Sequence, residues 1–177
     1  MMSSRPLRRA AALLSVLAAA VATASVAAPA HAAGLDQVCV GTEVTTFDPP
    51  LTLTARPTTV TVSGVYTTCT NPGAVTATYA ETFPLTASCL ALFDSGSALR
   101  TFTWGGTEAP STFQYNVTSS AVAGQVVVTN TGVITAGGFA PAGAEQVITL
   151  VTPNVLQCLV GGVASVSGPT TLTVHGA

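Results

Sequence analysis

The sequence predicts an all-β protein: an antiparallel β-sandwich, immunoglobulin-like or of a related Greek-key topology, with roughly eight to ten strands and two disulfides. Runs such as TVTVSGVYT and AVTATYAETF alternate apolar and threonine side chains, the period of two typical of a half-buried strand. Turn clusters such as DPP, TNPG and SGPT separate the runs. Beyond residue 33, no apolar repeat of helical period is longer than about two turns.

The first 32 residues are predicted to be a signal peptide with an apolar helical core. Arg5, Arg8 and Arg9 precede an alanine-rich stretch, and Ala30-His31-Ala32 supplies the small residues of a cleavage site. We expect cleavage after Ala32, which leaves residues 33–177 as a single secreted β-sandwich domain. The alanine-rich core is short for a membrane span, so we expect no membrane association after cleavage.

Charge patterning excludes one class of partner. Beyond the leader the chain has two cations, Arg56 and Arg100, against seven acidic side chains, a formal charge of −5. Nucleic-acid binding needs a basic surface, so we expect none here. Threonine supplies much of the polar surface, and its β-branched side chain suits a strand.

The cysteines are predicted to form disulfides, because their number is even and an exported chain meets an oxidising environment. Their spacing matches no zinc motif, and His175, near the end of the chain, is the sole histidine beyond the leader that could activate a thiol. Three connectivities are open to four cysteines, and the spacing does not select one. We favour the pairs Cys39–Cys69 and Cys89–Cys158.

Several short segments occur together in the predicted mature chain: CVG near its start, then DPPLTL, TWGG at Trp104, GVITAGGF, and LQC at Cys158. With these segments the chain resembles a group of uncharacterised small secreted two-disulfide β-proteins of actinomycetes, of Streptomyces type. The resemblance covers nearly the whole mature chain. It implies a two-disulfide β-domain and carries no known activity.

The sequence predicts no catalytic residue, no metal site and no cofactor. His175 is the one side chain beyond the leader that ordinarily titrates near neutral pH, and it lies close to the end of the chain. The carboxylates fall in no paired motif, and those of FDPP, YAETF, FDSGS and GTEAP are predicted to lie at turns or strand edges. A glycosidase with two distant carboxylates is the enzymatic alternative that stays open.

An aromatic hairpin is the most distinctive candidate site. The segment RTFTWGGTEAPSTFQYNV predicts two strands with Trp104 opposite Phe113 and Phe102 opposite Tyr115, and with Arg100 on the same face. We expect this face to be core. In the alternative interpretation, Trp104, Phe113 and Tyr115 form an exposed surface that binds a sugar or a protein partner.

Two functions follow from these observations. The first is a non-enzymatic extracellular domain with an interaction or structural role, directed at a protein or cell-surface partner. The second is a carrier that binds a small ligand or carbohydrate in an apolar, aromatic cleft. A cleft of roughly 300 Å³ or more lined by aromatic side chains would favour the carrier, and a filled core with flat faces would favour the interaction domain.

Overall fold

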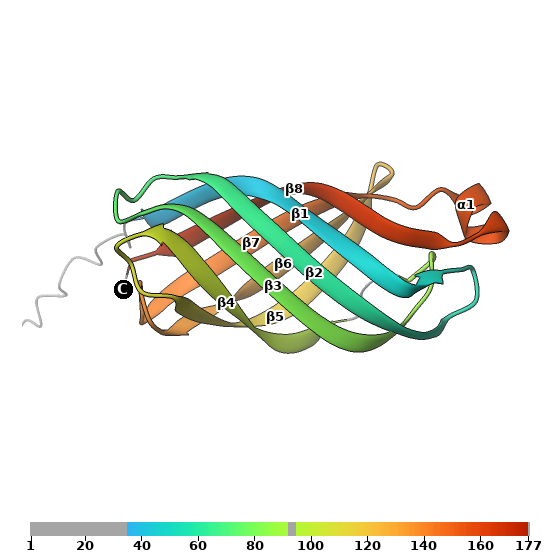
Figure 1. Cartoon of the computed structure of the whole chain (residues 1–177), viewed down its shortest axis with the longest axis horizontal. Helices are drawn as coiled ribbons and strands as arrows, with labels where there is room; N and C mark the ends of the chain where they lie inside the picture. Colours follow the sequence, from blue (N-terminus) through green and yellow to red (C-terminus); the bar gives the residue numbers. More distant parts are fainter. Residues whose placement is uncertain (1–34, 92–94, 177) are drawn as a thin grey trace, which may run out of the picture. The chain divides into compact units, whose positions relative to one another are not determined.

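Eight antiparallel strands close into one barrel in the computed structural model, which describes residues 35–91 and 95–176. Along the chain they are β1 (Leu35–Leu51), β2 (Arg56–Cys69), β3 (Ala74–Ala87), β4 (Gly96–Gly106), β5 (Ser111–Val122), β6 (Gln125–Ala136), β7 (Ala142–Val151) and β8 (Val163–His175), with helix α1 (Val155–Val160) between β7 and β8. Each strand pairs with its neighbours in sequence, and β1 pairs with β8 to close the sheet (Figure 1). The predicted signal peptide lies outside the described residues.

The predicted β-sandwich is wrong. A Greek-key sandwich needs two sheets and a long connection between non-adjacent strands, whereas here every connection joins adjacent strands of one closed sheet. The apolar–polar alternation could not separate the two folds, because both bury one face of every strand. The prediction of an antiparallel all-β fold with two disulfides is confirmed.

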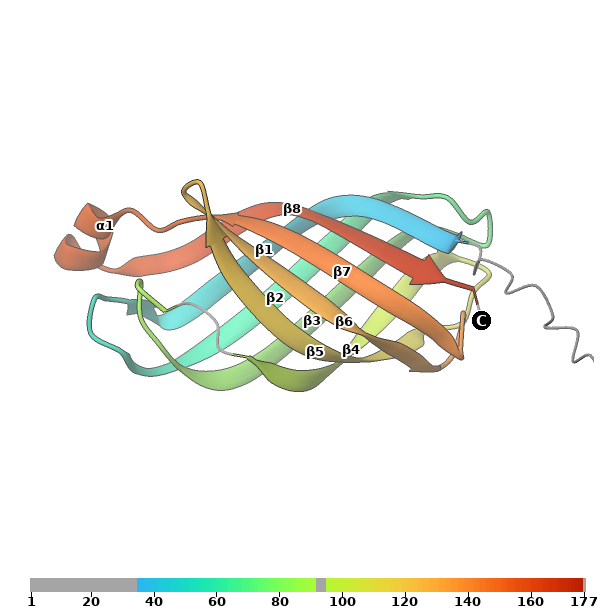
Figure 2. The ribbon, with the colours of Figure 1, turned by 180° about the vertical axis from the view of Figure 1, so that it is seen from behind.

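Strand length is the observation that separates the two folds. The strands run from 10 residues in β7 to 17 in β1. Typical strands have about five to six residues. Long strands that tilt around a common axis are what a closed barrel requires. Figure 2, the view from behind, shows β5, β6, β7 and β8 crossing the barrel obliquely side by side.

Most of the larger apolar side chains face the barrel interior, and most threonines face outward. In β2, for example, Val60, Val62 and Tyr66 are buried while Thr59 and Thr67 are exposed. At one end of the interior the rings form a continuous cluster around Phe102. Its ring centroid lies between 5.6 and 6.2 Å from those of four neighbours: Tyr66, Tyr79, Trp104 and Phe113. This part of the barrel is filled.

The register of the β4–β5 hairpin differs from the predicted one by four residues. Phe113 lies opposite Arg100 instead of Trp104, and Phe102 lies opposite Ser111. An even shift keeps the same side chains inward, so the alternation could not detect it. The last residues of β4 pair with β3 instead, and the Trp104 indole donates a 2.8 Å hydrogen bond to Ser111 Oγ.

Both disulfides join the cysteines favoured from the sequence, Cys39 with Cys69 and Cys89 with Cys158. The first bridges directly opposed residues of β1 and β2. The second ties α1 to the chain that follows β3. Two disulfides are typical of a protein that folds in an oxidising compartment.

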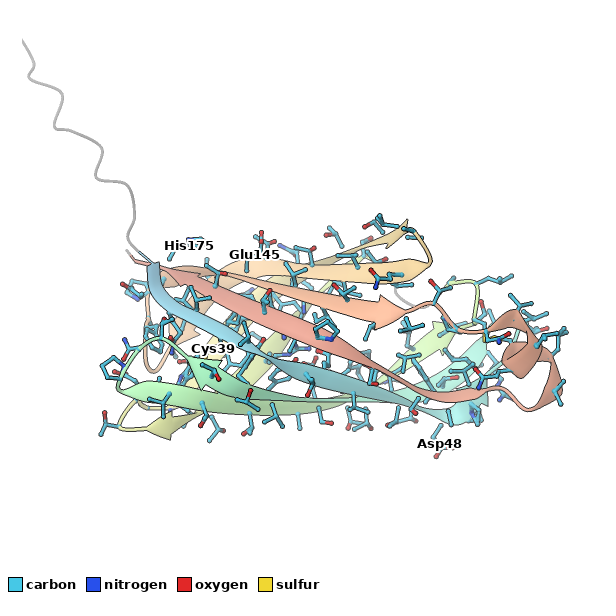
Figure 3. The ribbon with its side chains drawn as sticks, turned by 90° about the horizontal axis from the view of Figure 1, so that it is seen from above. Cys39, Asp48, Glu145 and His175 are labelled. Carbon is cyan, nitrogen blue, oxygen red and sulfur yellow. A yellow bond between two sulfur atoms is a disulfide. The ribbon has the colours of Figure 1, made fainter. Side chains whose placement is uncertain are left out.

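Charged outward side chains are few. Asp48, Glu145 and His175 all point away from the barrel wall (Figure 3). None of the helices within the described ranges has the length and apolarity that a membrane-spanning helix needs.

The Cys89–Cys158 bridge should contribute strongly to stability. It closes a chain segment with a sequence separation of 69, for which loop-closure entropy corresponds to about 4 kcal/mol. We expect the double variant Cys89→Ala, Cys158→Ala to lose about that much free energy of unfolding in a urea titration. The double variant Cys39→Ala, Cys69→Ala, with a separation of 30, is the comparison and should lose slightly less. A loss below 1 kcal/mol in the first variant would contradict this estimate.

Candidate functional site

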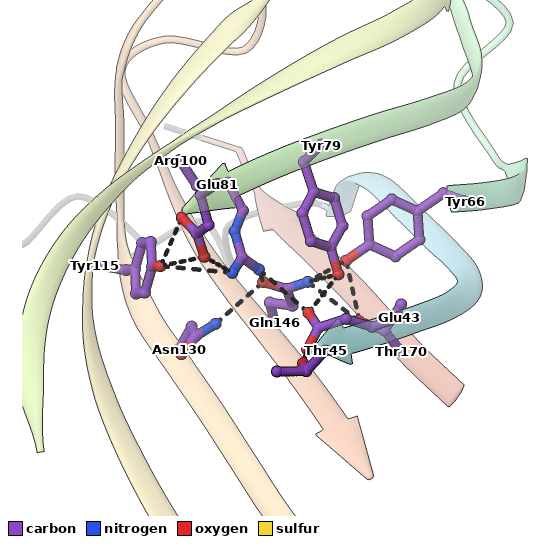
Figure 4. Close-up of polar contacts among 10 residues, drawn as sticks. All are labelled: Glu43, Thr45, Tyr66, Tyr79, Glu81, Arg100, Tyr115, Asn130, Gln146 and Thr170. Atoms are coloured by element: carbon purple, nitrogen blue, oxygen red, sulfur yellow. Dashed lines mark hydrogen bonds and ion pairs between the residues drawn. The ribbon is translucent and has the colours of Figure 1, made fainter. Parts of the chain in front are cut away.

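Ten polar side chains meet inside the barrel, and every one of the eight strands contributes at least one of them (Figure 4). We call this group the polar cluster. Buried polar groups are tolerated when they bond to one another, and most of these do. The polar cluster consists of Glu43, Thr45, Tyr66, Tyr79, Glu81, Arg100, Tyr115, Asn130, Gln146 and Thr170.

The Arg100 guanidinium is the centre of the polar cluster. Its Nη2 donates to Glu81 Oε1, and its Nη1 donates to Gln146 Oε1 and lies 3.7 Å from Glu43 Oε2. Its Cζ atom lies 4.2 Å from the ring centroid of Tyr79 and 5.2 Å from that of Tyr115. One cation, 4 % exposed, therefore lies between two carboxylates and two aromatic rings.

Gln146 fixes the orientation of the Asn130 side-chain amide. An arginine can only donate, so the atom that faces Arg100 Nη1 must be the Gln146 oxygen. That oxygen also accepts from Asn130 Nδ2 at 3.1 Å, while Gln146 Nε2 lies 2.8 Å from the hydroxyls of Tyr66 and Tyr79. The Asn130 Oδ1 atom must then face elsewhere, and it has no hydrogen-bond partner among the described residues.

Burial changes the acid–base behaviour of the polar cluster. Desolvation raises the pKa of Glu43 above its ordinary value, although Arg100 and the Tyr79 hydroxyl, which donates at 2.7 Å, oppose this effect. Desolvation also raises the pKa of Tyr66 to about 12. For Arg100, burial acts to lower the pKa, but the Glu81 carboxylate together with the Tyr115 and Tyr79 side chains outweighs it and the pKa rises, so this side chain stays charged.

Gly64 makes room for one of the rings. It lies opposite Tyr79 in the β2–β3 ladder, and a Cβ atom there would lie only 2.0 Å from the Tyr79 ring. The ring therefore covers the β2 backbone and carries its hydroxyl to Glu43 and Gln146. A larger residue at position 64 would displace that hydroxyl.

The barrel wall is open beside the polar cluster. Strands β3 and β4 pair only from Ala74 to Thr78 and from Thr103 to Gly106, and within the described residues the rest of the two strands forms no ladder with each other. A cleft of about 380 Å³ lies in this gap. We call it the side cleft, and it is lined by Glu81, Thr82, Phe83, Leu85, Ser95, Gly96, Ser97, Ala98, Leu99, Tyr115 and Val117.

A smaller cavity of about 50 Å³ lies deeper in the interior. It adjoins the side cleft, because the two share four lining residues: Glu81, Phe83, Tyr115 and Val117. Its other lining residues include Glu43, Arg100 and Asn130 of the polar cluster. A molecule in the side cleft can therefore place one end against buried polar groups while its body contacts apolar side chains.

The predicted aromatic site lies inside the barrel. Trp104 is 6 % exposed, Phe113 is fully buried and Tyr115 is 4 % exposed, so these rings form no outer surface. Phe113 and Tyr115 stack with ring centroids 5.1 Å apart, and Trp104 packs against Phe139. Of the three, Tyr115 alone lines the side cleft, and its hydroxyl donates to Glu81 at 3.0 Å.

Sequence reasoning missed the charged part of the site. The YAETF carboxylate, Glu81, was predicted to lie at a turn or strand edge, but it lies in the middle of β3 and points inward. The overlooked signal was the position of Glu81 in the strand. It lies two residues from Tyr79 and two from Phe83, so its side chain points to the same face as theirs. A charged residue on the apolar face of a strand predicts a buried partner.

Helix α1 carries an exposed apolar surface. Helix α1 is short, and its N-cap Asn154 accepts a hydrogen bond from Leu156 N at 2.9 Å. Cys158 is its buried residue. Four of its side chains are more than half exposed: Val155, Leu156, Leu159 and Val160.

Comparisons with protein families, with curated proteins and with solved structures find no match to this chain. In the described part of the chain, no three His, Cys, Asp or Glu side chains converge. The geometry instead defines a class of protein: an up-and-down β-barrel with a lateral cleft. Barrels of eight strands have an interior just wide enough to be filled by side chains or to hold one small ligand.

Removal of the central cation should be costly. The variant Arg100→Met leaves Glu43 and Glu81 buried without their counter-charge, and we expect the free energy of unfolding to fall by about 3–5 kcal/mol. Chemical denaturation monitored by circular dichroism measures this. Thr101→Ala, at the exposed next residue of β4, is the matched control and should change stability by less than about 0.5 kcal/mol. Equal effects in the two variants would show that the ion pairs do not hold the interior together.

Glu43 should make stability depend on pH. Its folded-state pKa lies above the ordinary 4.5, so the folded protein retains a proton that the unfolded chain releases. The free energy of unfolding should therefore lose a contribution as the pH rises from 4.5 toward the raised folded-state pKa. Glu43→Gln, which cannot titrate and keeps an acceptor for Tyr79, should abolish that loss. Urea titrations across this range measure it, with the exposed Glu145→Gln as control, and parallel profiles for wild type and Glu43→Gln would refute the assignment.

Proposed function

We propose that this protein is a non-enzymatic extracellular carrier that binds one small, mainly apolar molecule in the side cleft. The observation that carries the proposal is the side cleft itself, about 380 Å³ in volume and lined by Phe83 and Tyr115. This exceeds the size at which small-molecule sites begin, about 300 Å³. Apolar lining with a few convergent polar groups is the usual composition of such sites.

The position of the side cleft supports selective binding. The inward Phe83, Leu85, Ala98 and Val117 offer apolar area to the body of a ligand. The polar groups lie at one end, where the small cavity begins. A ligand that is apolar along most of its length and polar at one end fits this arrangement, whereas a carbohydrate with hydroxyls on every side does not.

Binding accounts for the polar cluster better than catalysis does. A general base or nucleophile is aimed at the substrate, whereas Glu43 and Glu81 both accept from tyrosine hydroxyls and face Arg100. His175 is exposed on the outer face, at the end of β8. We therefore assign the polar groups a binding role: they line the inner end of the site and offer hydrogen bonds to the ligand.

Secretion forms part of the proposal. The leader sequence has the three regions of a signal peptide, and both disulfides suit an oxidising extracellular environment. A protein released from the cell with one ligand-sized cleft is suited to carry or sequester a molecule that water dissolves poorly.

The other function expected from the sequence, a domain that acts through a protein or cell-surface partner, stays a prediction. The exposed apolar side chains of α1, among them Leu156 and Val160, are the observation that favours it. Because α1 and the side cleft involve different residues, the two functions are independent.

A filled side cleft should abolish ligand binding. We expect the uncharged fluorophore N-phenyl-1-naphthylamine to bind the wild-type protein with enhanced emission. The variant Ala98→Trp projects an indole into the side cleft and should weaken this binding at least tenfold. Thr101→Trp, which adds the same ring on the outward face of β4, is the matched control and should bind like wild type. Equal titration curves for the two variants, or no binding by wild type, would refute the proposal.

A further inference from the structure

Two buried atoms, each on a residue that lines the small cavity, have no hydrogen-bond partner among the described residues. One is an acceptor, Asn130 Oδ1, and the other is a donor, Arg100 Nε. Asn130 is 3 % exposed and Arg100 is 4 % exposed, and both residues line the small cavity. A buried polar atom without a partner is costly, so the pair points to a group that both accepts and donates.

The orientation of Asn130 is set by its neighbours, which makes the acceptor identity firm. Arg100 Nη1 requires the Gln146 oxygen to face it, and that oxygen requires the Asn130 nitrogen. Figure 4 shows the Asn130 amide nitrogen directed at Gln146. Exchange of the two Asn130 amide atoms would break that bond, so Oδ1 is the atom left for another partner.

Charge limits what that other partner can be. A cationic head group in the small cavity would lie beside the Arg100 guanidinium, and an anionic one would lie beside Glu43 and Glu81. Each would also leave one of the two atoms without a partner, because an ammonium group has no lone pair to accept from Arg100 Nε and a carboxylate has no proton to donate to Asn130 Oδ1. An uncharged head group that both donates and accepts can satisfy both atoms.

Size narrows the choice further. The small cavity holds about 50 Å³, far less than the about 380 Å³ of the side cleft. A small head group therefore fits it, and the apolar body of the ligand has to stay in the side cleft. A hydroxyl also has the required pair of functions, one O–H donor and two acceptor lone pairs.

We infer that the ligand of the side cleft is an apolar alcohol whose hydroxyl occupies the small cavity, donating to Asn130 Oδ1 and accepting from Arg100 Nε. The apolar body then extends past Phe83 and Val117, which line both spaces, toward Leu85 and Ala98. This inference rests on the proposed function and adds the chemical class of the ligand. Recognition depends on one hydrogen-bonding group, so the body of the alcohol is selected by shape alone.

Four probes of similar length test the inference: 1-octanol, methyl heptyl ether, octylamine and octanoate. Each is titrated against N-phenyl-1-naphthylamine bound to the wild-type protein. The ether keeps an acceptor oxygen but has no donor, so it isolates the bond to Asn130. We expect 1-octanol to bind at least tenfold more tightly than the ether, and both charged probes to bind more weakly than the alcohol.

The variant Asn130→Leu assigns the preference to its residue. It removes the acceptor and should reduce the ratio of the ether and alcohol dissociation constants toward one, while the ether itself still binds. Because the readout is a ratio within one variant, a general loss of stability does not imitate it. Val133→Leu, at an exposed position of the same strand, is the control and should keep the wild-type ratio.

The outcomes separate this inference from the proposed function. Equal binding of alcohol and ether by wild type, tighter binding of either charged probe, or an unchanged ratio in Asn130→Leu would overturn the alcohol assignment and leave the side cleft as a binding site. Failure of the fluorophore and of all four probes to bind would overturn both.

Discussion

The interior of this barrel depends on the compensation of charge around one guanidinium. Arg100 is the sole cation of the polar cluster, and it faces Glu43 from β1 and Glu81 from β3 while Gln146 from β7 accepts its third contact. Strands far apart in the sheet are thus held to a common centre. Burial of these ion pairs costs desolvation, which their mutual attraction and the hydrogen bonds with Gln146 and the tyrosines offset.

The open stretch between β3 and β4 lies at the level of that centre. Each strand is held there from its other side: β3 by β2 from Gly64 to Arg56, and β4 by β5 from Gly96 to Phe102. The wall can therefore part without loss of either hairpin. Glu81 belongs both to the ion pairs and to the lining of the side cleft. The same residue that stabilises the interior also sets the polarity at the inner end of the cleft.

Much of the fold could be predicted from residue patterns, and the failures have physical reasons. Alternation identified the strands and the inward face of the aromatic hairpin, and the predicted compartment indicated paired cysteines. Closure into a barrel could not be predicted, because it depends on pairing of β1 with β8, residues more than a hundred positions apart. The pairing of Arg100 with Phe113 in the β4–β5 ladder was missed, because a shift of the pairing by an even number of residues leaves the same side chains facing inward. Glu81 could have been predicted to point inward, since its parity matches that of its aromatic neighbours.

The gap in the ladder also bears on how such a protein can diversify. Phe83 and Leu85 of β3 and Ala98 of β4 form the cleft wall where the two strands share no residue pairs. Their replacement by larger or smaller side chains alters the shape of the cleft but leaves the pairing with β2 and β5 intact. Mutations that change the shape of the cleft are thus largely uncoupled from mutations that threaten folding. If the protein is the carrier proposed above, a lineage built on this scaffold could change its ligand by drift at a few positions.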